Sequence, residues 1–499
     1  MTPEASRAAR QPRNPLRPLE TVTPEQIEQL HQASLRILEE VGVEFQDAET
    51  LSLWGQAGAA VDHGAQRVRL DRGLVLELVA KAPRTFTWRA RQPAHSLQIG
   101  GDALAFGPCG GMVYVSDLER GRRVGTLADY EAFVKLAHLI PALHFAAWGQ
   151  VEPADLPVSV RHLYRLRSAF LLSDKPVSEA AHGREITADC VAMARLVFGD
   201  GDAQSASLKP PACPAATIGD VINVSSPLRF DQRMLGGLLT YARAGQATYI
   251  TPFILAGAMS PISLAAALAQ QNAEALAGVA LTQLARPGAP VLMGGFTTNT
   301  DMRSGSPAFG TPEGAWALSV GAQLARFYGL PYRGSGALTN ANVPDAQSAY
   351  ESLWTLWPAV LSGAHLIMHG AGWLEAGLTA SFEKFILDAE NLAMFEHFLE
   401  GPTIDDETLA LDLSAAVGAG AHTQARFASE FFRTTAADRL DYEAWAAAGS
   451  WDAPRRAQQV WQDLLNRYEP PALDPAIREA LDDYVARRER ELAGKNLYE

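Results

Sequence analysis

Short apolar runs alternate with longer helical patterns between residues 248 and 400. Apolar runs at about 248–255, 289–296 and 365–372 have the length of buried strands. Each is followed by a loop and then by a helix, and strand and helix alternate at least four times in this region. Such an order predicts parallel strands joined by right-handed crossovers.

Capping residues and helix breakers predict where the helices of this region begin and end. A helix from Pro261 to about Leu284 is expected to start at an N-cap, Ser260, and to stop at the Arg-Pro-Gly sequence of 286–288. Further helices are predicted over 311–328, 346–357 and 381–399, the second of them ending before Pro358.

The loops differ in length according to the end of the strand on which they lie. Loops that follow strands are long and rich in Gly, Ser, Thr and Asn, whereas the turns from a helix into the next strand are short. In a (β/α)8 barrel the loops after the strands build the active site. We therefore predict an α/β protein with a (β/α)8 TIM barrel, and a doubly wound open sheet remains the alternative.

Four regions are predicted from these patterns. Residues 1–22 are expected to be a disordered tail without the apolar core of a signal peptide, and 23–100 an N-terminal helical cap. The barrel is predicted over 101–450. A C-terminal helical extension is predicted over 451–499, where Asp474-Pro475 caps an amphipathic helix.

Composition and charge exclude several classes of protein. The run 244–273 carries no charge, but Pro252 and Pro261 divide it into a strand and a helix, so it is not expected to span a membrane. A formal net charge of −14 argues against a nucleic-acid partner. The cysteines are dispersed and are typical of a cytoplasmic protein; they are Cys109, Cys190 and Cys213.

The common catalytic motifs are absent from the sequence, including H-E-x-x-H, the P-loop, G-x-S-x-G and G-x-G-x-x-G. His365 and His369 could share one face of a strand, but no Cys or carboxylate stands beside them at metal-ligand spacing. We expect no metal site there. Cys109, in GPCGGM, is interpreted as a small buried residue rather than as a nucleophile.

Aromatic residues and a few charges occur in the predicted loops and strand ends. Rings at such positions could hold a quaternary ammonium through cation–π contacts. Arg303 could bind a carboxylate in a bidentate pair, and Glu375, which follows a buried strand, is a candidate functional carboxylate. The candidate aromatic residues are Phe106, Phe253, Phe296, Phe309, Tyr332 and Trp373.

Long motifs in this chain resemble the trimethylamine methyltransferase (MttB) family. They include SPLRFDQRMLGGLLTYARAGQ, TPFILAGAMSP, FGTPEGA, DAQSAYES and GWLEAGLTASFEKFILDAE, and the resemblance extends from about Pro24 to Arg488. Membership would imply a TIM barrel that transfers a methyl group from an amine to the cobalt of a separate corrinoid protein. Archaeal trimethylamine enzymes carry pyrrolysine, whereas every residue here is standard. The chain therefore resembles the branch without pyrrolysine, whose members act on quaternary amines such as glycine betaine.

The resemblance implies a division of roles among the candidate residues. The aromatic residues would hold the ammonium, Glu375 would supply a counter-charge, and Arg303 or His369 would bind the acid group of a betaine; Glu375 and His369 are the catalytic candidates. No tightly bound cofactor is expected, because the partner protein carries the corrinoid (cobalamin), and a homo-oligomer is expected. Two alternatives stay open: transfer to another acceptor such as tetrahydrofolate, and a non-catalytic quaternary-amine-binding barrel.

Overall fold

A parallel sheet forms the centre of the protein in the computed structural model, which describes residues 11–199, 214–410 and 420–497. Six parallel strands are hydrogen-bonded in the order β10, β12, β13, β16, β17 and β6. They cover Gly219–Val224, Ala247–Ala256, Val291–Gly294, Tyr332–Ser335, Leu366–Met368 and Ala105–Phe106. The outer half of β12 also pairs with β14 (Phe296–Thr300), on which β15 (Pro307–Ala308) folds back.

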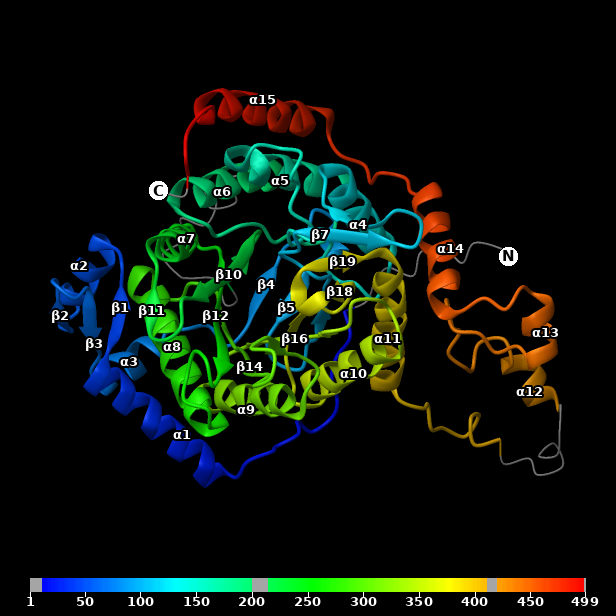
Figure 1. Ribbon diagram of the computed structural model, residues 1–499, viewed down its shortest axis with the longest axis horizontal. Helices are drawn as coiled ribbons and strands as arrows, with labels where there is room; N and C mark the ends of the chain where they lie inside the picture. Colours follow the sequence, from blue (N-terminus) through cyan, green and yellow to red (C-terminus); the bar gives the residue numbers. More distant parts are fainter. Residues whose placement is uncertain (1–10, 200–213, 411–419, 498–499) are drawn as a thin grey trace.

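Eight helices follow the strands or extended segments of this sheet and cover its outer side (Figure 1). The sequence order of strand then helix is kept throughout, which confirms the predicted α/β class and its parallel strands. The helices are α4 (Leu127–Leu139), α5 (Arg161–Leu172), α6 (Arg184–Phe198), α7 (Gln232–Arg243), α8 (Leu264–Ala285), α9 (Pro312–Tyr328), α10 (Ala346–Leu361) and α11 (Phe382–Glu400).

The regular strands do not close into a ring among the described residues, so the predicted barrel is confirmed only in part. Two irregular segments lie between β6 and β10. His144 N–H donates to Phe106 O, Ala146 N–H donates to Pro176 O, and a parallel bridge joins Ala147 to Val177. The hydroxyl of Ser178 then reaches Gly219 O of β10 at 2.5 Å.

Two helix boundaries differ from the prediction. Helix α8 begins at Leu264 with Ser263 as its N-cap, because Pro261 lies in an irregular segment that precedes the helix. Helix α10 continues through Pro358 to Leu361. The missing N–H of Pro358 removes one backbone hydrogen bond of the helix. The last turn is nevertheless kept, since Pro358 O accepts from Ser362 N–H.

The predicted helical cap at 23–100 contains strands as well as helices. The hairpin of β4 (Phe86–Trp88) and β5 (Leu97–Ile99) packs inside the sheet, where the Trp88 ring lies 5.2 Å from that of Phe145. A second small sheet has the strand order β11-β1-β3-β2. The elements of this region are α1 (Pro24–Arg36), a π-helical turn (Ile37–Val41), β1 (Val43–Phe45), α2 (Ala48–Gln56), β2 (Ala60–Asp62), β3 (Arg67–Arg69) and α3 (Arg72–Val79), with β9 (Ala215–Ala216) and β11 (Arg229–Phe230) pairing from later in the chain.

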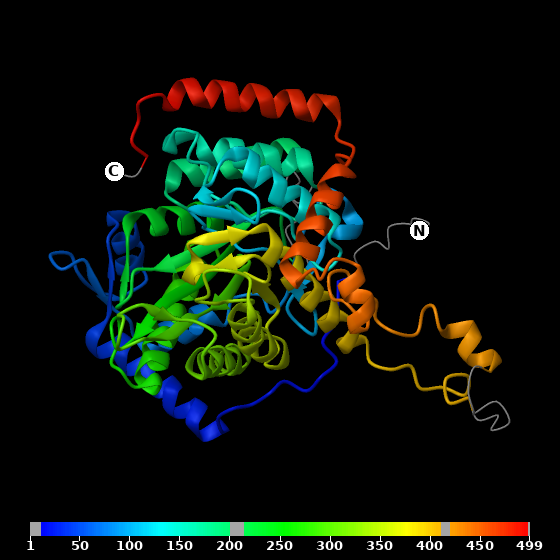
Figure 2. The ribbon, with the colours of Figure 1, turned by 45° about the vertical axis from the view of Figure 1, so that its right-hand side comes forward.

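Both ends of the described chain run along the body of the protein. Residues 11–22 of the predicted disordered tail are held by hydrogen bonds such as Leu19 N–H to Leu361 O, and residues 1–10 lie outside the described part. The predicted C-terminal helices occur as α14 (Ala453–Asn466) and α15 (Pro475–Leu492). Figure 2 shows α15 across α5 and α6. None of the described helices combines the length and apolar character needed to cross a membrane.

Candidate active site

A cavity of about 290 Å³ lies at the carboxyl ends of the parallel strands. Its walls come from side chains on β10, β12, β14 and β16 and from the residues just after β17. The loops that follow the strands surround the cavity. These are the long loops on which the sequence analysis placed the site. In sheets of this kind ligands bind at the carboxyl ends of the strands.

One wall of the cavity consists of aromatic rings. Phe253 and Phe296 are direct cross-strand partners on β12 and β14, which brings their ring centres to 5.4 Å. The Phe296 ring is also 5.6 Å from Phe309 and 6.0 Å from Trp373. Trp373 lies on a short strand, β18 (Trp373–Leu374), which pairs with β19 (Thr379–Ser381). Four of the predicted aromatic residues therefore meet in one wall: Phe253, Phe296, Phe309 and Trp373.

Arg333 on β16 places a buried positive charge beside this wall. Its side chain is 1% exposed, and its Cζ atom lies 5.4 Å from the Phe296 ring centre and 5.9 Å from that of Trp148. The guanidinium donates to Ser335 Oγ at 2.9 Å, and among the described residues no carboxylate forms an ion pair with it. Burial lowers the pKa of Arg333 to about 10, so the group is charged at neutral pH.

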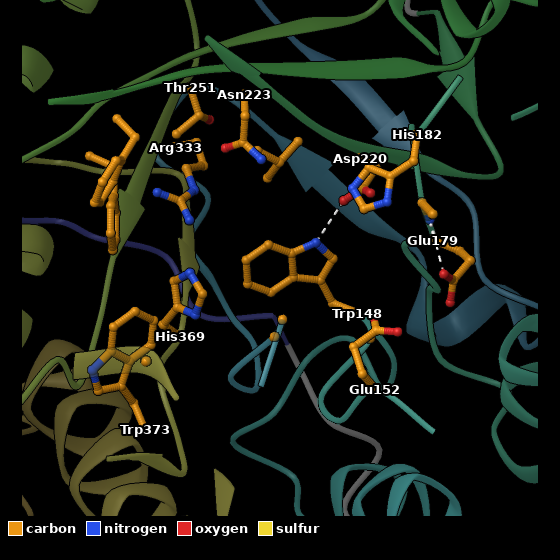
Figure 3. Close-up of a pocket in the computed structure, with 18 of the residues that line it drawn as sticks. Trp148, Glu152, Glu179, His182, Asp220, Asn223, Thr251, Arg333, His369 and Trp373 are labelled. Atoms are coloured by element: carbon orange, nitrogen blue, oxygen red, sulfur yellow. Dashed lines mark hydrogen bonds between the residues drawn. The ribbon is translucent and has the colours of Figure 1, made fainter. Parts of the chain in front are cut away.

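His369 follows β17 and faces the same space (Figure 3). Its backbone has φ +56°, and its ring centre lies 4.5 Å from Trp148 and 4.6 Å from Trp373. Burial, together with the nearby Arg333, holds its pKa well below the usual value, so the imidazole is neutral. The buried Nδ1 atom has no hydrogen-bond partner in the described part of the protein.

The opposite side of the cavity is polar (Figure 3). Trp148 Nε1–H donates to Asp220 Oδ1 at 2.6 Å, and Arg165 forms ion pairs with both Glu152 and Glu179. Burial raises the pKa values of Asp220 and Glu179. His182 also lines this side.

Two predicted aromatic residues lie outside the cavity lining. Tyr332 precedes Arg333 on β16 and points to the helical layer, where a Cβ atom on Gly321 would lie 2.4 Å from its hydroxyl. Phe106 is fully buried near His144, with 5.9 Å between the ring centres. Both side chains pack in the core.

The predicted charged residues are also separated from the cavity. Arg303 is exposed in the loop after β14. Glu375 does not line the cavity, and its carboxylate lies 2.8 Å from Arg122 Nε. Arg122 also stacks over Tyr114, with its Cζ 3.5 Å from the ring centre; Tyr114 is on β7 (Tyr114–Asp117), and β8 (Gly121–Val124) pairs with β7.

His365 and Cys109 have structural environments. His365 Nδ1 accepts from Tyr332 N–H and its Nε2–H donates to Gly101 O, so its ring links backbone groups. Cys109 is fully buried, and burial raises the pKa of its thiol. Cys213 lies outside the described residues. In the described ranges, no group of three or more His, Cys, Asp or Glu side chains could hold a metal ion.

Sequence reasoning missed Arg333, Trp148 and the polar side of the cavity. One signal for Arg333 was available, because a charged residue inside the short strand predicted in YGLPYRGSGA must be buried inside the sheet or paired. Trp148 and Asp220 carried no comparable signal, since their segments show no distinctive spacing.

Comparisons with known proteins identify relatives that share most of the length of this chain. The chain is 40% identical to glycine betaine methyltransferase of Desulfitobacterium hafniense, over 94% of this chain and 97% of that protein. It is 29% identical to a trimethylamine methyltransferase, MttB, of the same species, over 94% and 93% of the two chains. The crystal structure of Methanosarcina barkeri monomethylamine methyltransferase matches with a TM-score of 0.51 at 10% identity, over 92% of each chain, and supports the fold. The family model for trimethylamine methyltransferase (MTTB) matches residues 1–493, and this chain belongs to that family.

Proposed function

We propose that this protein moves a methyl group from a carboxylated quaternary amine of the glycine betaine type to the cobalt(I) of a corrinoid carried by a partner protein. The relative with 40% identity is named a glycine betaine methyltransferase, which supports the substrate class. The six parallel strands and the two extended segments at 144–148 and 176–180 would occupy the eight strand positions of the barrel that holds this site.

The unpaired charge of Arg333 is the observation that carries the proposal. A buried guanidinium without an anionic partner is costly, because its desolvation is not offset. A substrate carboxylate would supply the missing counter-ion through a planar, bidentate pair. Arg333 thereby takes the role that the sequence suggested for Arg303.

The aromatic wall beside Arg333 suits the other end of such a substrate. Ring faces attract a quaternary ammonium, which has no N–H to donate, by about 0.5 to 2 kcal/mol for each contact. Phe296 touches both regions, since it stacks with Phe253 and lies under the Arg333 cation. A small zwitterion would be fixed at both ends, with one methyl group directed toward the mouth.

The proposed methyl transfer requires neither a proton donor nor a nucleophile from the protein. A quaternary nitrogen already carries its charge, so the amine leaves as a neutral tertiary amine without a proton donor. The corrinoid supplies a strong cobalt(I) nucleophile. The protein must hold the methyl in line and exclude water. Neutral His369 adds no positive charge that would repel the ammonium, and the Trp148 and Trp373 rings lie beside it.

Methylation of free cob(I)alamin, followed by its visible spectrum, tests the proposal. Glycine betaine and other carboxylated quaternary amines should convert cob(I)alamin to methylcobalamin, and choline or tetramethylammonium should react much more slowly. Conversion of tetrahydrofolate instead of cob(I)alamin would favour the other acceptor. Ligand binding without turnover on any acceptor would contradict an enzymatic role.

A further inference from the structure

A buried ion pair on α11 lies close to the cavity without lining it. Lys384 Nζ donates to both carboxylate oxygens of Asp388 at 2.7 Å, and it also reaches Ser352 Oγ of α10 at 2.8 Å. Lys384 and Asp388 are 1% and 3% exposed. A buried pair of this kind adds little net stability, because its attraction is largely offset by the loss of hydration. Stability alone therefore does not account for the pair.

Asp388 also binds the backbone next to the aromatic wall. Its Oδ2 atom accepts from Gly372 N–H at 2.9 Å, and Gly372 O accepts from Ser381 N–H. Both backbone groups of Gly372 are thus fixed. This residue has φ +94°, and a Cβ atom on it would lie 2.9 Å from the Phe385 ring. The close approach of this segment to α11 therefore requires glycine.

The segment that ends at Gly372 carries one ring of the cavity and is followed by another. Residues 369–372 run beside 107–109 and are hydrogen-bonded to them through backbone groups. His369 begins the segment, and Trp373 follows it. Both side chains line the cavity, with 4.6 Å between their ring centres (Figure 3). A shift of the backbone at Gly372 would therefore move a ring of the aromatic wall.

We propose that Asp388 is a positioning residue for Trp373, and that Lys384 fixes the orientation of Asp388 toward Gly372 N–H. The inference rests on the proposed function, in which the aromatic wall holds the ammonium group. The indole has a second anchor, because its Nε1–H donates to Thr339 O at 3.1 Å. A cation–π contact requires the cation to lie over the ring face. One anchor on the backbone and one on the ring together keep that face in place.

Two double variants separate the positioning role from the stability of the ion pair. Lys384→Met/Asp388→Leu removes both charges and the acceptor for Gly372 N–H. Lys384→Met/Asp388→Asn also removes both charges, but it keeps an amide oxygen as an acceptor. Both partners are replaced together, because loss of one would leave the other charge buried and uncompensated. Lys384→Met/Asp388→Ala removes the same acceptor with a smaller side chain, in case leucine prevents folding.

Fluorine NMR of protein labelled with fluorotryptophan reports on the Trp373 ring without any substrate. Trp373→Phe assigns the resonance. It should shift or broaden in Lys384→Met/Asp388→Leu and keep its wild-type position in Lys384→Met/Asp388→Asn. Because no turnover is needed, this measurement decides the positioning role even if the wild-type protein transfers no methyl group from any betaine. That result would count against the proposed function alone.

Steady-state kinetics connect the ring position to binding. The KM for glycine betaine should rise about three- to tenfold in Lys384→Met/Asp388→Leu, with kcat little changed, since the ring contacts the ammonium both before and during transfer. In Lys384→Met/Asp388→Asn the KM should stay close to the wild-type value.

Leu399→Ala controls for a general loss of stability. Leu399 is buried at the other end of α11, so its replacement should lower the melting temperature without raising KM. An unchanged Trp373 resonance in folded Lys384→Met/Asp388→Leu would overturn the proposal. Equal changes in the leucine and asparagine variants, or an equal rise of KM in Leu399→Ala, would do the same.

Discussion

Tyr332 and Arg333 are neighbours on β16 and point to opposite sides of the sheet. The Tyr332 hydroxyl packs against α9 at Gly321, whereas the Arg333 guanidinium lies in the cavity between Trp148 and Phe296. Alternation along a strand decides this difference. One of the pair stabilises the core, and the other supplies the cavity with an unpaired positive charge.

Replacement of Arg333 should raise the KM for carboxylated substrates and leave the KM for substrates without a carboxylate nearly unchanged. Arg333→Met removes a charge-assisted contact that contributes about 1.5 to 3 kcal/mol, so the KM for glycine betaine should rise roughly 10- to 150-fold. The KM for tetramethylammonium should change little. Arg303→Met is the control, since Arg303 is exposed, and steady-state kinetics of both variants provide the measurement. An equal loss on both substrates would contradict the carboxylate contact.

Phe296 should contribute to binding of the ammonium group. Phe296→Leu keeps an apolar side chain but removes the ring face, and kcat/KM should fall about 2- to 30-fold for every quaternary amine. Phe106→Leu is a useful comparison, because Phe106 is buried in the core and is not part of the cavity lining. That change should lower the melting temperature and leave KM unaltered. An unchanged kcat/KM in Phe296→Leu, together with a raised KM in Phe106→Leu, would contradict a role of the aromatic wall in substrate binding.

Glu375 is expected to act through Arg122. The pair joins the turn at 375–377 to β8, and Ala376 and Gly377 of this turn line the cavity. Glu375→Gln and Arg122→Gln should each lower kcat/KM about two- to fivefold, and the double variant should lose no more than either single one. A much larger effect of Glu375→Gln than of Arg122→Gln would instead support the direct counter-charge that the sequence suggested.

His182 should make stability depend on pH in the acidic range. Burial lowers the pKa of His182 to about 4, below its unfolded value of 6.5. Between these values the unfolded chain binds a proton that the folded chain does not, so stability falls as the pH drops from 6.5 to 4, by up to about 1.4 kcal/mol per pH unit. Urea midpoints of His182→Gln should show a shallower dependence than wild type. Identical slopes would mean that His182 titrates normally.

The aromatic candidates show how much of the cavity lining could be predicted from the sequence. Phe253 and Phe296 stand near the carboxyl ends of predicted strands, and both line the cavity. Phe106 and Tyr332 have the same residue type and similar positions, but they face the core. Residue type and strand position could not separate these cases, because the face of each side chain depends on register. Register is set by pairing partners far away in the chain.

The charged candidates show a second limit. Arg303 and Glu375 stood in loops with suitable composition, yet one is exposed and the other is bound to Arg122. The buried cation of the cavity, Arg333, instead lies within strand β16, whose residues are all buried. The ion-pair partners of loop residues are often distant in the chain, so the local sequence does not indicate them.

By itself the sequence determined the order of strands and helices, the helix starts near residues 311, 346 and 381, and the family, because these depend on local periodicity, local start signals and long motifs. Only the tertiary structure decided which side chains share the cavity and which of the aromatic candidates pack in the core instead. Those relationships join residues up to hundreds of positions apart, and they exist only once the sheet brings its strands together.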